Sequence, residues 1–227
     1  MAVINMHQTT QTDTYVAMTT RQSKHINPAM TVSERAAKRA FDIVVSSIVL
    51  FLVLPVLAVV ALAIKLTSEG PVLFKQERVG ENGKLFHIYK FRSMVVNAAN
   101  ISVTDENGKE VHKTRHDPRV TPIGRIVRKT SLDELPQLIN VLKGEMSLVG
   151  PRPELPKLVA TYDDWQYERF SVPQGITGWW QVTGRSDKPC HENTDQDVFY
   201  IKQYNLLLDL KILLMTVPAL LKGKGAF

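Results

Sequence analysis

An uninterrupted apolar run from Ile43 to Ile64 limits what this chain can fold into more than any other part of the sequence. Its twenty-two residues carry no charge, and Ser46 and Ser47 are the only polar side chains among them. As a straight helix the run would rise roughly 33 Å, enough to cross a hydrocarbon core of about 30 Å. The run therefore predicts a segment that lies in a membrane.

Pro55 lies near the middle of this run, where it removes one backbone hydrogen bond and kinks a helix. Each half alone would rise only roughly 18 Å, too little to cross a bilayer. Basic residues flank the run on both sides, which indicates that both ends are cytoplasmic. They are Arg35, Lys38 and Arg39 before it and Lys65, Lys75 and Arg78 after it. Two topologies stay open on these residues alone, a re-entrant helix broken at Pro55 and a kinked helix that spans the bilayer.

The rest of the chain predicts an α+β fold that is mainly helical. Stretches that favour strands lie on either side of Glu81-Asn82-Gly83 and predict a small β-hairpin. Residues 97–118 are polar and predict a long connection. Apolar spacing predicts helices over 123–130 and 131–144. The stretch 206–221 is interrupted by Pro218 and contains two charges, so it predicts an amphipathic helix at the membrane interface or a core helix.

Composition divides the chain into three parts. Residues 1–30 contain few large apolar side chains and predict a disordered tail. Residues 31–66 predict the membrane anchor, and residues 67–227 predict one domain on the cytosolic face. A single cysteine excludes an internal disulfide and any zinc site that needs two thiolates.

The formal net charge of +6 comes from basic residues concentrated between the apolar run and Gly184. This excess predicts a phosphate-bearing ligand, but on the charge alone the favoured interpretation is a cationic surface attracted to anionic phospholipid headgroups. No nucleic-acid recognition motif is present, so we expect no nucleic-acid partner.

Two adjacent carboxylates, Asp133 and Glu134, lie at the predicted start of the helix over 131–144. In the structural interpretation Ser131 is the N-cap and Glu134 completes a capping box. That interpretation leaves Pro136 unexplained, because its missing N–H would leave the Leu132 carbonyl unpaired.

In the functional interpretation, helix N–H groups and arginines hold a phosphate that one of these carboxylates attacks. The other carboxylate binds Mg²⁺, which takes one or two carboxylates together with phosphate oxygens of a substrate.

Five motifs follow one another along the chain, and in this order they resemble those of the bacterial sugar transferase family, the monotopic phosphoglycosyl transferases. They are Lys38-Arg39-x-Phe41-Asp42, Tyr89-Lys90-Phe91-Arg92-Ser93-Met94, Ser131-Leu132-Asp133-Glu134-Leu135-Pro136-Gln137, Leu148-Val149-Gly150-Pro151-Arg152-Pro153, and Gly175-Ile176-Thr177-Gly178-Trp179 continuing to Gly184-Arg185. The similarity runs from about residue 35 to the C-terminus.

The resemblance implies that residues 67–227 form a catalytic domain on the cytosolic face of the bacterial inner membrane. The implied reaction moves a sugar 1-phosphate from a UDP-sugar to undecaprenyl phosphate and releases UMP through a covalent phosphoaspartate. Asp133 matches the nucleophile, and Glu134, with Asp133, matches the Mg²⁺ site. The resemblance also implies that the segment around Pro55 is re-entrant.

Arg128, Arg152 and Arg185 match basic positions of the family, and we assign them to phosphate or nucleotide contacts together with Lys90. The structural alternatives are a rigid proline loop around Arg152 and a strand lysine at the membrane surface for Lys90. Gly184-Arg185-Ser186-Asp187 is similar to members that use UDP-galactose or UDP-glucose. The oligomeric state stays open, a homo-oligomer included, and the rival hypothesis is a basic membrane scaffold without catalysis.

Overall fold

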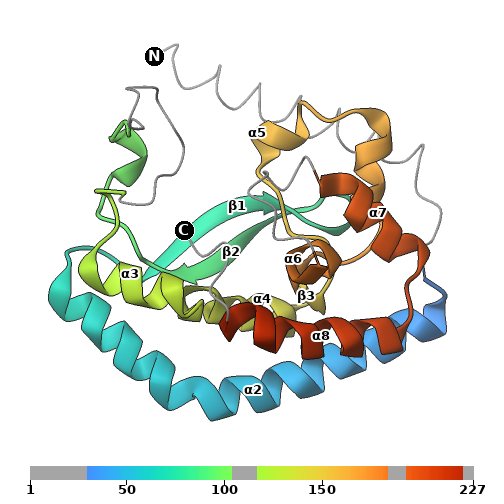
Figure 1. Ribbon diagram of the computed structural model, residues 1–227, viewed down its shortest axis with the longest axis horizontal. Coiled ribbons are helices and arrows are strands. Elements are labelled where there is room, and N and C mark those ends of the chain that lie inside the picture. The colour runs from blue at the N-terminus through green and yellow to red at the C-terminus, as the bar shows by residue number, and fades with distance from the viewer. Residues whose placement is uncertain (1–29, 104–116, 184–192, 222–227) are drawn as a thin grey trace.

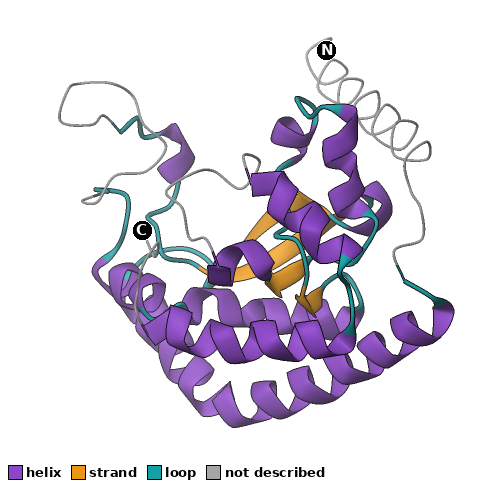
Figure 2. Ribbon diagram, turned by 45° about the vertical axis from the view of Figure 1, so that its right-hand side comes forward, coloured by secondary structure: helices purple, strands orange, loops and turns teal. Residues whose placement is uncertain are grey.

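The computed structural model describes residues 30–103, 117–183 and 193–221. Four of the described helices form one side of the molecule: α2 (Val32–Thr67), α3 (Pro122–Lys129), α4 (Leu138–Lys143) and α8 (Leu206–Leu221). α2 runs along the outside, and the other three lie against it (Figure 1). Strands and short helices lie above this layer (Figure 2), which confirms the predicted α+β, mainly helical fold.

The short elements of the described residues complete the fold, with η denoting a 3-10 helix. In chain order they are β1 (Leu73–Val79), η1 (Glu81–Gly83), β2 (Leu85–Phe91), η2 (Ala98–Asn100), η3 (Leu132–Gln137), β3 (Ser147–Val149), α5 (Pro156–Val159), η4 (Asp164–Phe170), β4 (Gly175–Thr177), α6 (Trp179–Thr183) and α7 (Thr194–Lys202). The predicted tail lies outside the described residues except for Met30, and part of the predicted connection over 97–118 does so as well.

The apolar run forms the middle of α2, which is the helix of the described chain that is long and apolar enough to cross a membrane. A capping box between Thr31 and Glu34 starts the helix, which continues through Pro55. Its two ends rise toward the same side of the molecule (Figure 1), so α2 is bent and not divided into two helices. A proline removes a single hydrogen bond of the ladder, which is enough to bend a helix that its neighbours support.

One face of α2 packs on the domain, and the opposite face is apolar and exposed. Only 11% of its most apolar 18-residue stretch is buried. The exposed side chains are Ile43, Val44, Ile48, Phe51, Leu52, Leu54, Val56, Val59, Leu62 and Leu66. Water would solvate this surface poorly, so the exposed face is the part of α2 that suits lipid.

Buried polar contacts attach the first half of α2 to the domain. The Lys38 Nζ donates to the Asp209 carboxylate of α8 at 2.6 Å and to the Val149 carbonyl at 2.9 Å. The Tyr200 hydroxyl donates to the other Asp209 oxygen at 2.7 Å. Asp42 accepts from the Leu148 amide at 3.0 Å. The buried Lys38 and Asp209 charges thus neutralise each other and have further hydrogen-bond partners, as a desolvated ion pair requires.

Apolar contacts attach the second half of α2 to the same domain. Leu57, Val60 and Ile64 form one buried cluster with Phe91 of β2 and Val127 of α3. Both halves of α2 therefore rest on one globular body.

The strands confirm the predicted hairpin and add a sheet that the sequence does not reveal. β1 and β2 are antiparallel, and Asn82 and Gly83 turn the chain with φ of 53° and 71°. β3 and β4 pair in parallel, and their backbones approach so closely that a Cβ on Gly150 would lie 2.3 Å from the Pro173 carbonyl oxygen. Only glycine fits at that contact. The contact brings the Leu148–Pro153 motif next to the motif that begins at Gly175.

α8 buries one face in the core and exposes apolar side chains on another, so it is amphipathic as predicted; its place at a membrane interface stays a prediction. Asp209 and Ile212 are fully buried, whereas Leu207 and Leu214 are exposed by 77% and 67%. Pro218 lies inside the helix without ending it.

Replacing Lys38 by Met should lower the free energy of unfolding by about 3–5 kcal/mol, because Asp209 would be left buried without its cation. Thermal unfolding in detergent measures the loss. The matched control is Arg35→Gln, which removes the more exposed pair with Glu81 and should cost about 1 kcal/mol or less. Equal losses in the two variants would contradict the assigned role of the buried pair.

Candidate active site

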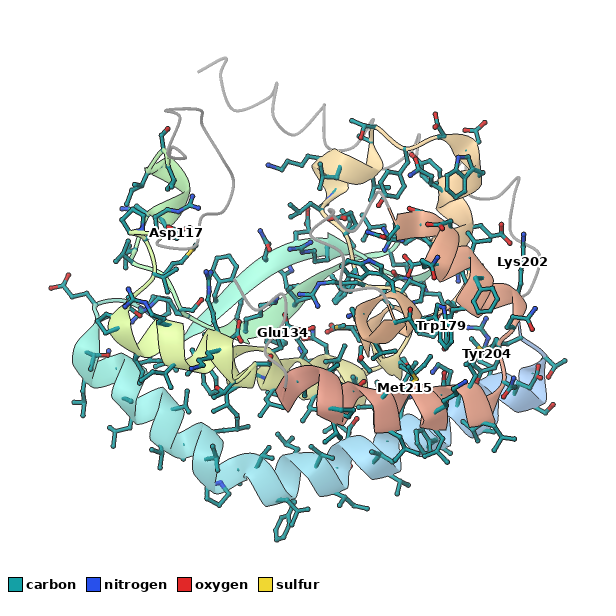
Figure 3. All side chains as sticks on the ribbon, in the orientation of Figure 1. Asp117, Glu134, Trp179, Lys202, Tyr204 and Met215 are labelled. Carbon is teal, nitrogen blue, oxygen red and sulfur yellow. The ribbon has the colours of Figure 1, made fainter. Side chains whose placement is uncertain are left out.

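Asp133 and Glu134 lie on η3, directly after α3 and against β2. Glu134 is placed between the hairpin above it and the layer of helices below it (Figure 3). The chain enters η3 through Ser131, whose φ of 56° is left-handed. This sharp turn separates α3 from η3. It places the Asp133 and Glu134 carboxylates next to each other in the first turn of η3.

The predicted helix over 131–144 and its capping box are wrong in detail. Ser131 makes no side-chain cap, and its carbonyl accepts from the Glu134 amide at 3.2 Å instead. The segment is the 3-10 helix η3 followed by α4. Pro136 explains the division, because it cannot donate the hydrogen bond that an α-helix would need there. The Glu134 side chain therefore does not cap a helix and can bond to groups of other elements.

Two cations hold the Glu134 carboxylate. The Arg152 guanidinium binds both of its oxygens, with Nη2 at 2.6 Å and Nη1 at 3.1 Å. The Lys90 Nζ of β2 donates to the same carboxylate at 3.0 Å. Burial opposes the charge of Glu134, but Arg152 and Lys90 outweigh it and hold its pKa well below the usual 4.5. Glu134 is therefore a firmly ionised carboxylate.

Asp133 has the opposite environment. Within the described part of the chain, no basic side chain forms an ion pair with it. Burial, assisted by the neighbouring Glu134 charge, raises its pKa, whereas Lys90 and Arg128 oppose the rise. A carboxylate with a raised pKa is more basic and less well solvated, which favours nucleophilic attack.

Arg128 lies on α3, within the electrostatic range of Asp133. Its Nε donates to the Ser93 hydroxyl at 2.8 Å, so the end of the Tyr89–Met94 motif orients this guanidinium. α3 can reach Ser93 because of Gly124, where a Cβ would lie 2.0 Å from the Ser93 carbonyl oxygen. Ser93 is not among the predicted site residues, although it belongs to the Tyr89–Met94 motif and directly precedes Met94, which forms an isolated bridge with Val120.

The donor set suits a hard cation that a substrate completes. Among the described residues, no three His, Cys, Asp or Glu side chains converge as they would in a site built by protein alone. Asp133 and Glu134 supply adjacent carboxylate oxygens, and Mg²⁺ is commonly held by one or two carboxylates together with substrate phosphates. The pair therefore fits the predicted Mg²⁺, which stays a prediction.

The structure brings together five of the predicted site residues. Asp133, Glu134, Lys90, Arg128 and Arg152 converge from η3, β2, α3 and the loop after β3. Arg185 lies outside the described residues. The roles assigned to these side chains stay predictions.

Trp179 packs against the neighbouring helices. The Trp179 ring lies 5.4 Å from the Phe199 ring, and the Lys211 ammonium lies 5.8 Å from the Trp179 ring. Trp165 is half exposed on η4. These contacts pack α6 against α7 and α8.

Residues 33–223 match the family described as bacterial sugar transferase. The chain is 43% identical over 205 residues to an undecaprenyl-phosphate galactose phosphotransferase of Salmonella typhimurium, covering 86% of this chain and 42% of the relative. It is 43% identical over 207 residues to the UDP-glucose:undecaprenyl-phosphate glucose-1-phosphate transferase of Escherichia coli K12, covering 85% and 42%. An uncharacterised sugar transferase of Bacillus subtilis is 40% identical over 188 residues, covering 83% and 89%. The chain thus spans about two fifths of the first two relatives and most of the third.

The pairing of Glu134 predicts an acid-dependent contribution to stability. Because its pKa is lower in the folded than in the unfolded protein, the carboxylate stabilises the fold at neutral pH, and this contribution is lost as the pH falls below 4.5. The Tm difference between the parent protein and Glu134→Gln should therefore narrow in acid. Glu69→Gln, at an exposed carboxylate, is the control and should show no such trend. A difference independent of pH would contradict the ionised pairing.

Proposed function

The chain belongs to the bacterial sugar transferase family, and on that premise we propose that it moves a sugar 1-phosphate from a UDP-sugar to undecaprenyl phosphate and releases UMP. The names of the Salmonella and Escherichia relatives support the acceptor and the reaction type. The observation that carries the proposal is the contrast between the two adjacent carboxylates. One has a raised pKa and no ion pair among the described residues, and the other is fixed by two cations.

Asp133 is the proposed nucleophile. Its carboxylate oxygen attacks the phosphorus that bears the sugar, the bond from that phosphorus to the bridging oxygen breaks, and UMP leaves with the electron pair. A phosphate oxygen of undecaprenyl phosphate then attacks the same phosphorus and releases the Asp133 carboxylate. Neither attack needs a general base, because both nucleophiles are already ionised.

The neighbouring cations reduce the repulsion that each attack faces. Arg128, Arg152 and Lys90 supply positive charge around the two carboxylates, and an anion of the substrate can share it. Mg²⁺ held by Glu134 and Asp133 would supply charge neutralisation on the diphosphate. Arg185 keeps the phosphate-binding role that the family motif implies.

The proposed location is the cytosolic face of the bacterial inner membrane, with α2 as a re-entrant anchor. Both halves of α2 rest on one domain, the first through Lys38 and the second through Ile64. A helix that crossed the bilayer would have to leave that domain at one of these two contacts. The basic side chains near the exposed apolar faces, such as Arg125 and Lys129 on α3, suit anionic phospholipid.

The donor sugar is proposed as galactose or glucose. The names of the relatives from Salmonella and Escherichia state these two sugars. The motif of this chain that is similar to users of these sugars, 184–187, lies outside the described part, so the proposal rests on the relatives and on the motif.

Asp133→Asn should lower lipid-dependent UMP release about a thousandfold or more, because the amide has no anionic oxygen to attack phosphorus. The assay supplies Mg²⁺, undecaprenyl phosphate and a panel of UDP-sugars to purified protein, and it names the sugar at the same time. The matched control is Asp164→Asn, at an exposed carboxylate on η4, which should keep full activity.

The outcomes separate this function from its rivals. UMP release that requires the lipid supports the proposal, whereas UDP release would replace it with ordinary glycosyl transfer. Full activity in Asp133→Asn would remove this residue as nucleophile. If the folded protein releases no nucleotide from any UDP-sugar of the panel, the result would favour the scaffold hypothesis, which predicts no turnover.

The re-entrant anchor predicts that both ends of α2 face the cytosol. Single cysteines at Ser33 and Glu69, in a protein whose Cys190 is replaced by serine, should both resist an impermeant thiol reagent in intact cells and react in inverted vesicles. Both positions are exposed at the ends of the helix. Labelling of Ser33→Cys from outside the cell would establish a spanning helix instead.

A further inference from the structure

The loop that carries Arg152 is anchored at every residue from Val149 to Glu154. Its backbone groups bond to partners on four other parts of the fold, at 2.8–3.2 Å. The pairs are Val149 O with Lys38 Nζ, Gly150 N with Thr177 O, Pro151 O with Gly175 N, Arg152 O with Arg169 Nη2, Pro153 O with Arg78 Nη1, and Glu154 O with Val79 N.

The anchor at Arg152 itself is a buried arginine that nothing in the proposed mechanism uses. Arg169 lies on η4 and is fully buried. Its Nη2 bridges two acceptors, the Arg152 carbonyl at 2.8 Å and the Asp197 carboxylate of α7 at 2.7 Å. Its Nη1 donates to the Tyr162 hydroxyl, and its guanidinium lies over the rings of Tyr162 and Phe170 at 5.8 and 5.6 Å.

This geometry limits the freedom of Arg152 at the point where it matters. Pro151 and Pro153 fix their own φ, and the residue before a proline is confined to extended backbone. Arg169 adds a hydrogen bond to the Arg152 carbonyl, which holds this backbone in place between the two prolines. A backbone held at this point limits the directions from which the Arg152 side chain can reach Glu134.

We propose that Arg169, fixed by Asp197 and Tyr162, is a positioning residue that aims the Arg152 guanidinium at Glu134. It touches neither carboxylate of the site. Its planar fork is required, because one Nη2 must donate to two acceptors while Nη1 reaches a third, which a lysine ammonium of different shape cannot reproduce. The consequence for catalysis rests on the proposed function, but the consequence for Glu134 does not.

The first measurement therefore needs no activity. Nitrogen-15 NMR of arginine-labelled protein follows the Arg152 side-chain N–H signal, and Arg152→Met identifies it. Glu134→Gln should shift this signal, because the Arg152 guanidinium binds both oxygens of the Glu134 carboxylate. In an Arg169→Lys background the same substitution should shift the signal much less, because Arg152 is no longer aimed at position 134.

The second measurement is the kinetic cycle over the same variants. Arg169→Lys should reduce kcat about ten- to a hundredfold with a smaller change in KM, and it should have no effect once Arg152 is methionine. Effects that multiply in the double variant would mean that Arg169 acts independently of Arg152 and would overturn the proposal.

Milder variants keep the test decisive where Arg169→Lys does not fold. Tyr162→Phe removes one hydrogen bond and keeps the ring, and Asp197→Asn removes the buried charge. In both variants, Glu134→Gln should shift the Arg152 side-chain signal less than it does in the parent protein. The control is Asp195→Asn, at an exposed position on the same helix as Asp197, where the shift should stay as large as in the parent. An undiminished shift in folded Tyr162→Phe and Asp197→Asn would overturn the proposal, and a diminished shift without detectable turnover would contradict only the proposed function.

Discussion

The buried ion pair between Lys38 and Asp209 is the interaction on which the arrangement of membrane helix and domain depends. An apolar helix in contact with lipid gains little by packing on a soluble domain, because lipid solvates its outer face equally well. The pair supplies a specific contact instead, since breaking it would leave a charge unpaired in a buried place. Lys38 also donates to Val149, the first residue of the loop that leads to Arg152. The same side chain therefore joins α2 both to α8 and to the loop that carries the site's arginine.

Local sequence predicts the elements whose signals are local. The length of the apolar run gives α2, and Asn82 and Gly83 give the turn between β1 and β2, because few other residues tolerate left-handed backbone. The short parallel pair of β3 and β4 could not be predicted, since three residues per strand carry no period and the pairing joins segments far apart in the chain. The division of 131–144 was signalled by Pro136, but a capping-box pattern at Ser131 and Glu134 competed with it. Tertiary ion pairs decided the outcome, because Glu134 bonds to Arg152 and Lys90 from other elements.

The site shows how two consecutive carboxylates acquire different chemistry. In an α-helix that begins at Ser131, Glu134 would turn back to its own backbone. The 3-10 geometry of η3 leaves it facing Lys90 and Arg152, while Asp133 stays within range of Arg128 without pairing to it. Because one carboxylate takes up the nearby cations, the other keeps the basicity that burial gives it. Adjacent positions in the chain are sufficient for this contrast, provided that only one of the two carboxylates forms ion pairs with the nearby cations.

The loop from Val149 to Glu154 unites these constraints. Its first carbonyl is held from the membrane helix by Lys38, and its Arg152 carbonyl is held from η4 by Arg169. Two prolines and a glycine that admits no side chain leave the loop little freedom of its own. A rigid loop holds the Arg152 guanidinium close to Glu134 before substrate binds. Substrate binding then does not have to order this side chain, which is the condition for electrostatic preorganisation. The guanidinium proposed to bind phosphate is thus arranged before a substrate arrives, and α2 takes part in arranging it.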